Sequence, residues 1–144
     1  MSDPVSSFDL TLEQLAGYEF KVGWDKPWAE LKTDEPPPLG KDAGPGPSRM
    51  LAVAIANCLA SSLLFCLSRK GEKVEGLTAR VHVEIVRNAE RRLRVGKVDV
   101  TLKAPLERDS KALLECIDTF EDFCTITESV RAGVQVNVNV EAVG

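Results

Sequence analysis

The sequence predicts an α+β fold in which an antiparallel sheet wraps around one long buried helix. The stretch from Pro47 to Lys70 holds no charge between Arg49 and Arg69 and is rich in Leu, Ala, Val and Ile, as expected of a buried helix. On either side of this stretch, apolar and polar residues alternate, which is the pattern of half-buried strands. The length of 144 residues favours a single compact domain.

The segment before the helix is expected to contain two strands and a long loop. Residues 1–16 give a weak pattern, and we treat them as an N-terminal arm beside a single domain at 17–144. Apolar residues alternate with polar ones from Tyr18 to Trp24, and a second short strand is expected at Ala29–Thr33. Residues 34–47 read DEPPPLGKDAGPGP, and this density of proline and glycine predicts an irregular loop.

The central helix is expected to begin at Pro47 and to end at Gly71. Proline suits the first helical turn, and glycine is typical of the position just after a helix. The uncharged run is near the lower length limit of a membrane span. It contains the polar residues Asn57, Ser61 and Ser62, however, so we expect a buried helix of a protein without a membrane partner.

A β-hairpin is expected to follow the helix. Its strands are predicted at Leu77–Ile85 and Arg92–Lys103, where apolar and polar residues alternate. The alternation of the second strand changes parity at Gly96. A β-bulge at this glycine is the simplest explanation.

Two helices and a last strand are expected at the C-terminal end. The apolar spacing in Asp109–Phe123 predicts an amphipathic helix. Thr125–Glu128 reads TITE, which is a capping box that opens a second short helix, and Gly133 ends that helix. Valine at every second position from Val134 to Val140 predicts a final strand.

Charge and composition argue against several classes of function. The net charge is −4 and the isoelectric point is about 5.1, so nucleic acids and anionic membranes are not expected as partners. The N-terminal stretch MSDPVSSFDL does not read as a secretory signal. We therefore expect a cytoplasmic protein whose four cysteines are free thiols.

The cysteines differ in what their positions suggest. Cys66 and Cys116 fit small buried core residues. Cys124 directly precedes the predicted short helix, whose positive end favours a thiolate. Cys58 lies among small residues in the central helix, and its position alone fits either core packing or a reactive thiol. No C-x-x-C pair is present and His82 is the only histidine, so neither a metal site nor a bound cofactor is expected.

The runs DEPPPLG, GPGPSR and LAVAIANC, followed later by FEDFCTITESVRAGVQV, resemble the OsmC/Ohr family of thiol-dependent peroxidases. These are the osmotically inducible and organic hydroperoxide resistance proteins. The resemblance covers about residues 17–142, and Cys58 and Cys124 have the separation of 66 positions expected for the family's reactive pair. The sequence is more similar to the broad OsmC-like branch than to the Ohr branch.

The resemblance implies an OsmC-like fold and an intertwined homodimer with two active sites, each set on the central helix at the subunit interface. Cys58 would be the peroxidatic thiol, which a hydroperoxide oxidises to a sulfenic acid, and Cys124 would resolve it as a disulfide. The substrates would be organic hydroperoxides, with hydrogen peroxide as a further candidate. An external dithiol, such as a lipoylated protein, would restore both thiols.

Three departures from the family pattern concern the site. Ser48 and Arg49 stand where the family commonly has a glutamate. The arginine that the Ohr branch normally has in the N-terminal strands has no counterpart, because no arginine precedes Arg49. We hypothesise that Arg49 supplies the cation that favours the Cys58 thiolate; a solvated residue at the helix start is the alternative. Thr125 stands where a proline is frequent. These departures leave open a non-catalytic dimer that binds an apolar small molecule or a partner.

Overall fold

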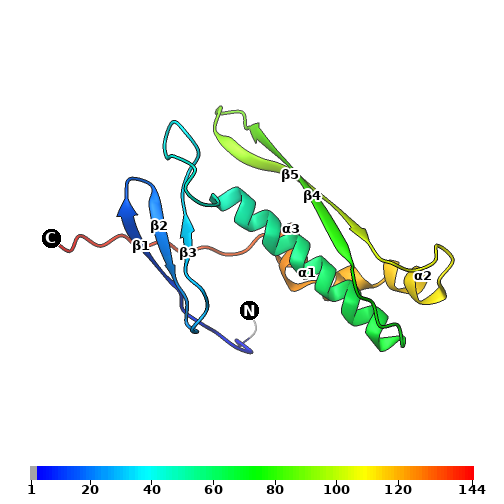
Figure 1. Ribbon diagram of the computed structural model, residues 1–144. Helices are drawn as coiled ribbons and strands as arrows, with labels where there is room; N and C mark the ends of the chain where they lie inside the picture. The colour runs from blue at the N-terminus through cyan, green and yellow to red at the C-terminus, as the bar shows by residue number, and fades with distance from the viewer. Residues whose placement is uncertain (1–2) are drawn as a thin grey trace. The chain divides into compact units, whose positions relative to one another are not determined.

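The computed structural model describes residues 3–144. The chain divides into two compact units, one ending at Leu51 and one beginning at Ala52, and each is described by itself. The helices and strands, shown in Figure 1, are β1 (Thr11–Ala16), β2 (Glu19–Gly23), β3 (Leu31–Thr33), α1 (Pro47–Arg69), β4 (Thr78–Arg87), β5 (Leu93–Lys103), α2 (Lys111–Ile117), the 3-10 helix η1 (Phe120–Phe123) and α3 (Thr125–Ala132).

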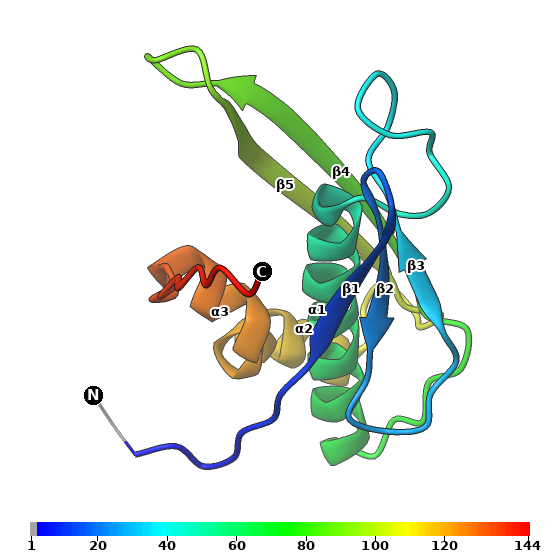
Figure 2. The ribbon, with the colours of Figure 1, turned by 90° about the vertical axis from the view of Figure 1, so that its left-hand side faces the viewer.

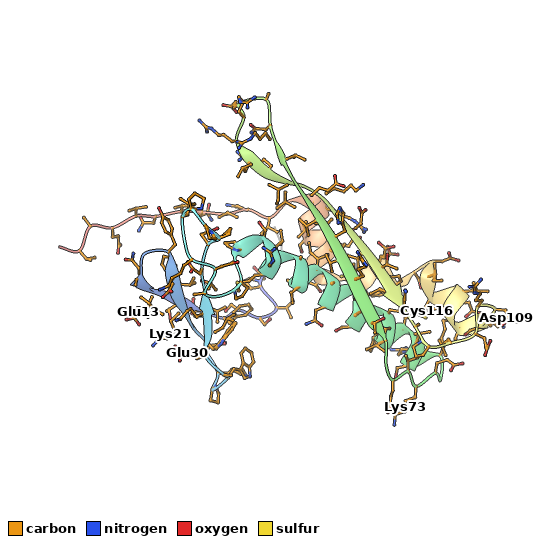
Figure 3. All side chains as sticks on the ribbon, turned by 45° about the horizontal axis from the view of Figure 1, so that its top comes forward. Glu13, Lys21, Glu30, Lys73, Asp109 and Cys116 are labelled. Atoms are coloured by element: carbon orange, nitrogen blue, oxygen red, sulfur yellow. A yellow bond between two sulfur atoms is a disulfide. The ribbon has the colours of Figure 1, made fainter. Side chains whose placement is uncertain are left out.

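The first unit contains an antiparallel sheet in the order β1-β2-β3, visible in Figure 2. Strands β2 and β3 confirm the two strands expected there. Residues 11–16, which the sequence analysis assigned to an arm, form β1 instead, and Leu12 pairs with Val22. Every residue of β1 is exposed. Because no face of this strand is buried, its sequence carries little of the alternation that identifies a strand. Glu13 of β1 and Lys21 of β2, both labelled in Figure 3, form an ion pair across these two strands, with 3.9 Å between Glu13 Oε2 and Lys21 Nζ.

The loop between β3 and α1 is irregular, as expected, and it is organised around Asp34. The carboxylate of Asp34 accepts backbone N–H bonds from Glu35, Lys41 and Ala43 at 2.8, 3.2 and 3.0 Å. The Ala43 N–H, together with the other two donors, holds the pKa of Asp34 below its usual value, although burial acts in the opposite direction. One side chain therefore fixes the shape of a proline-rich loop.

Helix α1 confirms the central helix of the sequence analysis, but only one stripe of it is buried in this chain. The stripe consists of Ala52, Ile55, Ala56, Leu59, Leu63 and Leu67. On other faces, Val53 and Phe65 are 65% and 59% exposed. By length and composition alone α1 could cross a membrane, with a mean hydropathy of 2.2, but core helices of soluble proteins meet the same criterion.

Strands β4 and β5 form the expected antiparallel hairpin of the second unit. The pairing shifts between Glu84 and Ile85, so that Gly96 is the extra residue on β5 and the predicted bulge is confirmed. A Cβ atom at Gly96 would lie only 2.7 Å from a methyl carbon of Val86. The close approach of the two strands therefore requires glycine.

The single helix expected over 109–123 is interrupted. It consists of α2, whose N-cap Ser110 accepts the Leu113 N–H at 3.2 Å, and the 3-10 helix η1. The interruption still lets both Cys116 and Phe120 contact the same core cluster. The spacing of apolar residues therefore identified the buried side of the segment but not its continuity.

Helix α3 begins at Thr125 itself, whereas a capping box that starts at Thr125 would make this residue the N-cap and begin the helix one residue later. Cys124 occupies the N-cap position, and its side chain makes no capping hydrogen bond. Glu128, expected to close the box, instead accepts a hydrogen bond from Arg131 at 2.6 Å. The C-terminal end is as predicted, since Gly133 takes a positive φ of 83° that suits glycine.

The prediction of a final strand from Val134 to Val140 is wrong for this single chain. The segment forms no strand, and its alternating valines are 64–88% exposed. Alternation shows that a segment can form a strand, whereas a strand also needs a paired neighbour. None of the described strands pairs with this segment.

Cys66 and Cys116 are joined in a disulfide, so the expectation that all four cysteines are free thiols is wrong. Their Cα atoms are 5.9 Å apart, although 50 positions separate them in sequence. Figure 3 labels Cys116. The sequence analysis treated each as an isolated core residue because no spacing rule relates a cysteine on one helix to a cysteine on a remote one. The prediction of burial was correct for Cys116, which is fully buried.

Candidate active site

The second unit brings together Cys58 and Cys124. Cys58 lies near the middle of α1, and Cys124 occupies the N-cap of α3. The Ile126 N–H donates to Cys58 Sγ at 3.5 Å, and Ile126 follows the N-cap Cys124 by two positions. Both cysteines are free. The site therefore places two free thiols at the N-terminal end of α3, supplied by helices far apart in the sequence.

The two thiols differ in their accessibility. Cys58 is half-buried, whereas Cys124 is fully buried. The Ile126 N–H belongs to the first turn of α3, where backbone N–H groups are free of intrahelical partners and the helix dipole is positive. This donor can stabilise negative charge on Cys58 Sγ. Cys58 is thus the more accessible sulfur, and Cys124 lies behind it.

The pKa of Cys124 reflects two opposing effects. Burial of the Cys124 thiol raises its pKa, but hydrogen bonding with Thr127, Cys58 and Ser62 lowers it below the ordinary value. The Cys124 thiol donates to Thr127 Oγ1 at 3.0 Å, and Thr127 is itself buried. A hydroxyl can also donate, so the same side chain can stabilise the thiolate once the thiol has lost its proton.

Arg49 lies in the first turn of α1, nine positions before Cys58. This separation corresponds to roughly 13.5 Å along the helix axis. Of the three residues singled out from the sequence, the structure thus brings together the two cysteines but places Arg49 more than two turns away along the helix. Its role as the cation for Cys58 stays a prediction.

An apolar cavity of about 570 Å³ lies next to the thiols within the second unit. One wall is the α1 face formed by Ile55, Leu59 and Leu63, and the opposite side is formed by β5 and by α2, η1 and α3. Neither cysteine lines the cavity, but Thr127 does. The same residue therefore contacts both the cavity and the Cys124 thiol.

Each charged residue that lines this cavity has a partner of opposite charge. Arg131 donates to Glu121 at 2.7 Å and to Glu128 at 2.6 Å. These two carboxylates, Glu121 first, raise the pKa of Arg131, so it carries its charge at any physiological pH. Lys97, the third charged residue of the lining beside Glu121 and Arg131, lies 3.3 Å from a carboxylate oxygen of Asp99. The cavity suits an apolar group.

Sequence reasoning missed the partners of Cys124. Thr127 follows Cys124 by three positions, which is one helical turn, but the presumed capping box directed attention to Thr125 and Glu128 instead. Ser62 follows Cys58 by four positions and therefore lies on the same face of α1. The sequence analysis noted Ser62 only as a polar residue that argues against a membrane span. No group of three or more His, Cys, Asp or Glu side chains that could bind a metal ion is present among residues 3–144.

The comparison with protein families fits this geometry. Residues 40–139 match the model of the OsmC-like protein family, and the chain belongs to this family. No curated protein matches the sequence. The family range includes both free cysteines and both cysteines of the disulfide.

Solved structures show the same fold at low sequence identity. An OsmC-like protein from Mycoplasma pneumoniae is similar with a TM-score of 0.71 and 17% identity, over 96% of this chain and 98% of that one. An organic hydroperoxide resistance protein from Elizabethkingia anophelis has a TM-score of 0.69 and 17% identity, over 89% of this chain and 91% of that one. The organic hydroperoxide resistance protein OhrB of Bacillus subtilis has a TM-score of 0.66 and 15% identity, over 89% of this chain and 93% of that one. The α+β, OsmC-like fold expected from the sequence is thereby confirmed.

Proposed function

We propose that this protein is a thiol peroxidase that reduces organic hydroperoxides, with hydrogen peroxide as a further candidate substrate. The observation that carries the proposal is that two free thiols meet at the N-terminal end of α3, where Cys58 Sγ accepts the Ile126 N–H at 3.5 Å and Cys124 is the N-cap residue. Membership of the OsmC-like family and the fold shared with two organic hydroperoxide resistance proteins support a role related to peroxides.

In the proposed cycle, the Cys58 thiolate attacks the distal oxygen of the hydroperoxide. The O–O bond breaks, the alkoxide takes up a proton and leaves as an alcohol, and Cys58 becomes a sulfenic acid. The Cys124 thiolate then attacks the Cys58 sulfur; an S–S bond forms and the hydroxyl group leaves with a proton as water. An external dithiol, such as that of a lipoylated protein, reduces this disulfide by exchange and becomes a disulfide itself.

The different accessibilities of the two sulfur atoms support this division of roles. A hydroperoxide must reach the attacking thiolate, and Cys58 is the half-buried member of the pair. Cys124 has no exposed surface and a lowered pKa, which suits a thiolate that waits for the sulfenic acid rather than for the substrate. The apolar cavity beside Thr127 would receive the organic group of the substrate.

We further propose that the protein acts as a homodimer in the cytoplasm. Exposed apolar side chains on α1, among them Val53 and Phe65, offer a surface for a second copy. The alternating valines from Val134 to Val140 form no strand within the chain and would pair with a strand of the second subunit. In this assembly, Arg49 remains the proposed cation for Cys58.

A non-catalytic dimer that binds an apolar small molecule is the second candidate. It is favoured by one observation, namely that neither thiol lines the cavity. In that case the protein would retain an apolar ligand but would not consume hydroperoxide.

A consumption assay tests the proposed activity. Purified protein is given an organic hydroperoxide and a dithiol, and the wild type is compared with Cys58→Ser and Cys124→Ser. We expect no turnover with Cys58→Ser. We expect Cys124→Ser to reduce one equivalent of hydroperoxide as Cys58 becomes a sulfenic acid, and a second equivalent as that acid is oxidised further to sulfinic acid, because no neighbouring thiol traps it. Full activity in Cys58→Ser would refute the proposal.

A further inference from the structure

The second unit contains another pair of cysteines that the proposed cycle does not use. Cys66 lies on the C-terminal half of α1, and Cys116 lies on α2. Their disulfide closes a stretch that contains the whole β4–β5 hairpin. The Cα separation of 5.9 Å lies within the range of ordinary disulfides.

This disulfide lies in the core of the unit. Cys116 is fully buried and forms a cluster with Leu63 and Leu67 of α1. Partly buried side chains from the hairpin and from α2 and η1 surround the cluster, among them Leu102, Leu113 and Phe120. A thiolate must reach a disulfide sulfur in order to exchange with it. The surrounding side chains therefore shield Cys116 from soluble thiols.

The two cysteine pairs are nested along the chain. Cys66 follows Cys58 by eight positions on α1, and Cys116 precedes Cys124 by eight positions on the segment that packs against it. The inner pair is a disulfide, and the outer pair is two free thiols that meet at the N-terminal end of α3. Eight residues correspond to roughly 12 Å along a helix, which is beyond the Cα separation of about 7 Å that a disulfide allows. The inner bond therefore cannot exchange directly with Cys58.

We propose that the Cys66–Cys116 disulfide is a positioning device that holds the segment from α2 to α3 in register on α1 and so keeps Cys124 within reach of Cys58. The proposal rests on the proposed function only in taking Cys58 and Cys124 as the reactive pair. The inner disulfide itself is not reduced or re-formed during the cycle.

Chain connectivity sets the size of the expected effect. Without the inner bond, a stretch of 66 positions joins Cys58 to Cys124; with it, the path consists of two arms of eight positions each. For a fully flexible chain, the probability that the ends meet falls with about the 3/2 power of the length, so the shorter path would be favourable by about eightfold. Because α1 and the β4–β5 hairpin are folded, this value is the upper limit of the effect. Loss of the inner disulfide should therefore lower the effective concentration of Cys124 at Cys58, by at most about eightfold.

The test measures this effective concentration without any hydroperoxide. Wild type and the double variant Cys66→Ala/Cys116→Ala are equilibrated in glutathione buffers, in which glutathione disulfide accepts two electrons from the Cys58 and Cys124 thiols and becomes two glutathione thiols. Alkylation and non-reducing peptide mapping give the fraction of Cys58–Cys124 disulfide. The same maps show whether Cys66–Cys116 stays joined in the wild type.

Two further variants separate the covalent link from packing. Leu106→Ala removes a side chain from the same cluster but leaves the disulfide intact. Cys66→Val/Cys116→Ala lacks the link but restores volume, in case the double alanine variant does not fold. We expect the variants without the disulfide to lose effective concentration, by at most about eightfold, and Leu106→Ala to lose none.

A folded variant without the disulfide that keeps the wild-type equilibrium would overturn the proposal, and so would native wild type with free Cys66 and Cys116 thiols. A loss of the same size in Leu106→Ala would also overturn it, because packing alone would then explain the effect. Failure of the proposed peroxidase activity is seen separately, since the glutathione equilibrium involves no peroxide.

Discussion

The hydrogen bond between Thr127 and Cys124 leads to a specific prediction for the variant Thr127→Val. Valine has nearly the shape of threonine but lacks the hydroxyl that lies 3.0 Å from Cys124 Sγ. Thr127 is 6% exposed and Cys124 is fully buried, so water has little room to replace the lost donor. A hydrogen bond to a charged group contributes about 1.5–3 kcal/mol, which corresponds to about a tenfold to hundredfold change in the ratio of thiolate to thiol.

The expected result is a rise in the pKa of Cys124, because the Thr127 hydroxyl, which accepts from the neutral thiol, would donate a stronger charge-assisted hydrogen bond to the thiolate. The measurement is a pH titration of the Cys124 Cβ signal by carbon NMR, which does not require a reagent to reach the buried sulfur. Thr127→Ser keeps the hydroxyl and should keep the pKa. Thr125→Val serves as the matched control, since it changes the same side-chain type two positions earlier on α3.

A pKa of Cys124 that does not rise in Thr127→Val would refute the assignment of Thr127 as the principal donor. The proposed cycle adds a second readout. With less thiolate at Cys124, the sulfenic acid at Cys58 is trapped more slowly, so a larger share of Cys58 should be overoxidised after repeated exposure to hydroperoxide.

Two predictions concern stability, one for each unit. Leu67→Ala should lower the free energy of unfolding by about 2–5 kcal/mol, because Leu67 is fully buried in the core of the second unit. Urea unfolding followed by circular dichroism measures this change, and an unchanged unfolding midpoint would contradict the packing described. Asp34 has a lowered pKa in the folded state, so its stabilising contribution is complete above the unfolded value of 3.8 and is lost as the pH falls through the folded value. The loss of stability on acidification should therefore be smaller in Asp34→Asn than in the wild type, and equal pH dependence of the two proteins would show that this carboxylate plays no part.

Much of the fold could be predicted from the sequence because periodic patterns report which face of an element is buried. The length of α1, both strands of the hairpin and the bulge at Gly96 follow from such patterns. Strand β1 and the unpaired segment from Val134 to Val140 could not be predicted in the same way. The first has no buried face, and the second has the pattern of a strand but no neighbour within the chain.

The candidate site was predictable in part. Position at a helix start and the resemblance to a family pointed to Cys124 and Cys58. The disulfide between Cys66 and Cys116 depends on how α1 packs against a segment 50 positions away, and such a tertiary contact leaves no local pattern in a single sequence. The contact of Cys124 with Thr127 is local, but the expected capping box directed attention to Thr125 and Glu128 instead.

The most direct test of the account is to treat the reduced Cys58–Cys124 pair with one equivalent of an organic hydroperoxide and to map the disulfides under non-reducing conditions. We predict that the hydroperoxide is reduced to its alcohol and that a peptide containing Cys58 becomes linked to a peptide containing Cys124, while Cys66 and Cys116 stay joined. Intact hydroperoxide, with Cys58 and Cys124 still present as free thiols, would contradict the account.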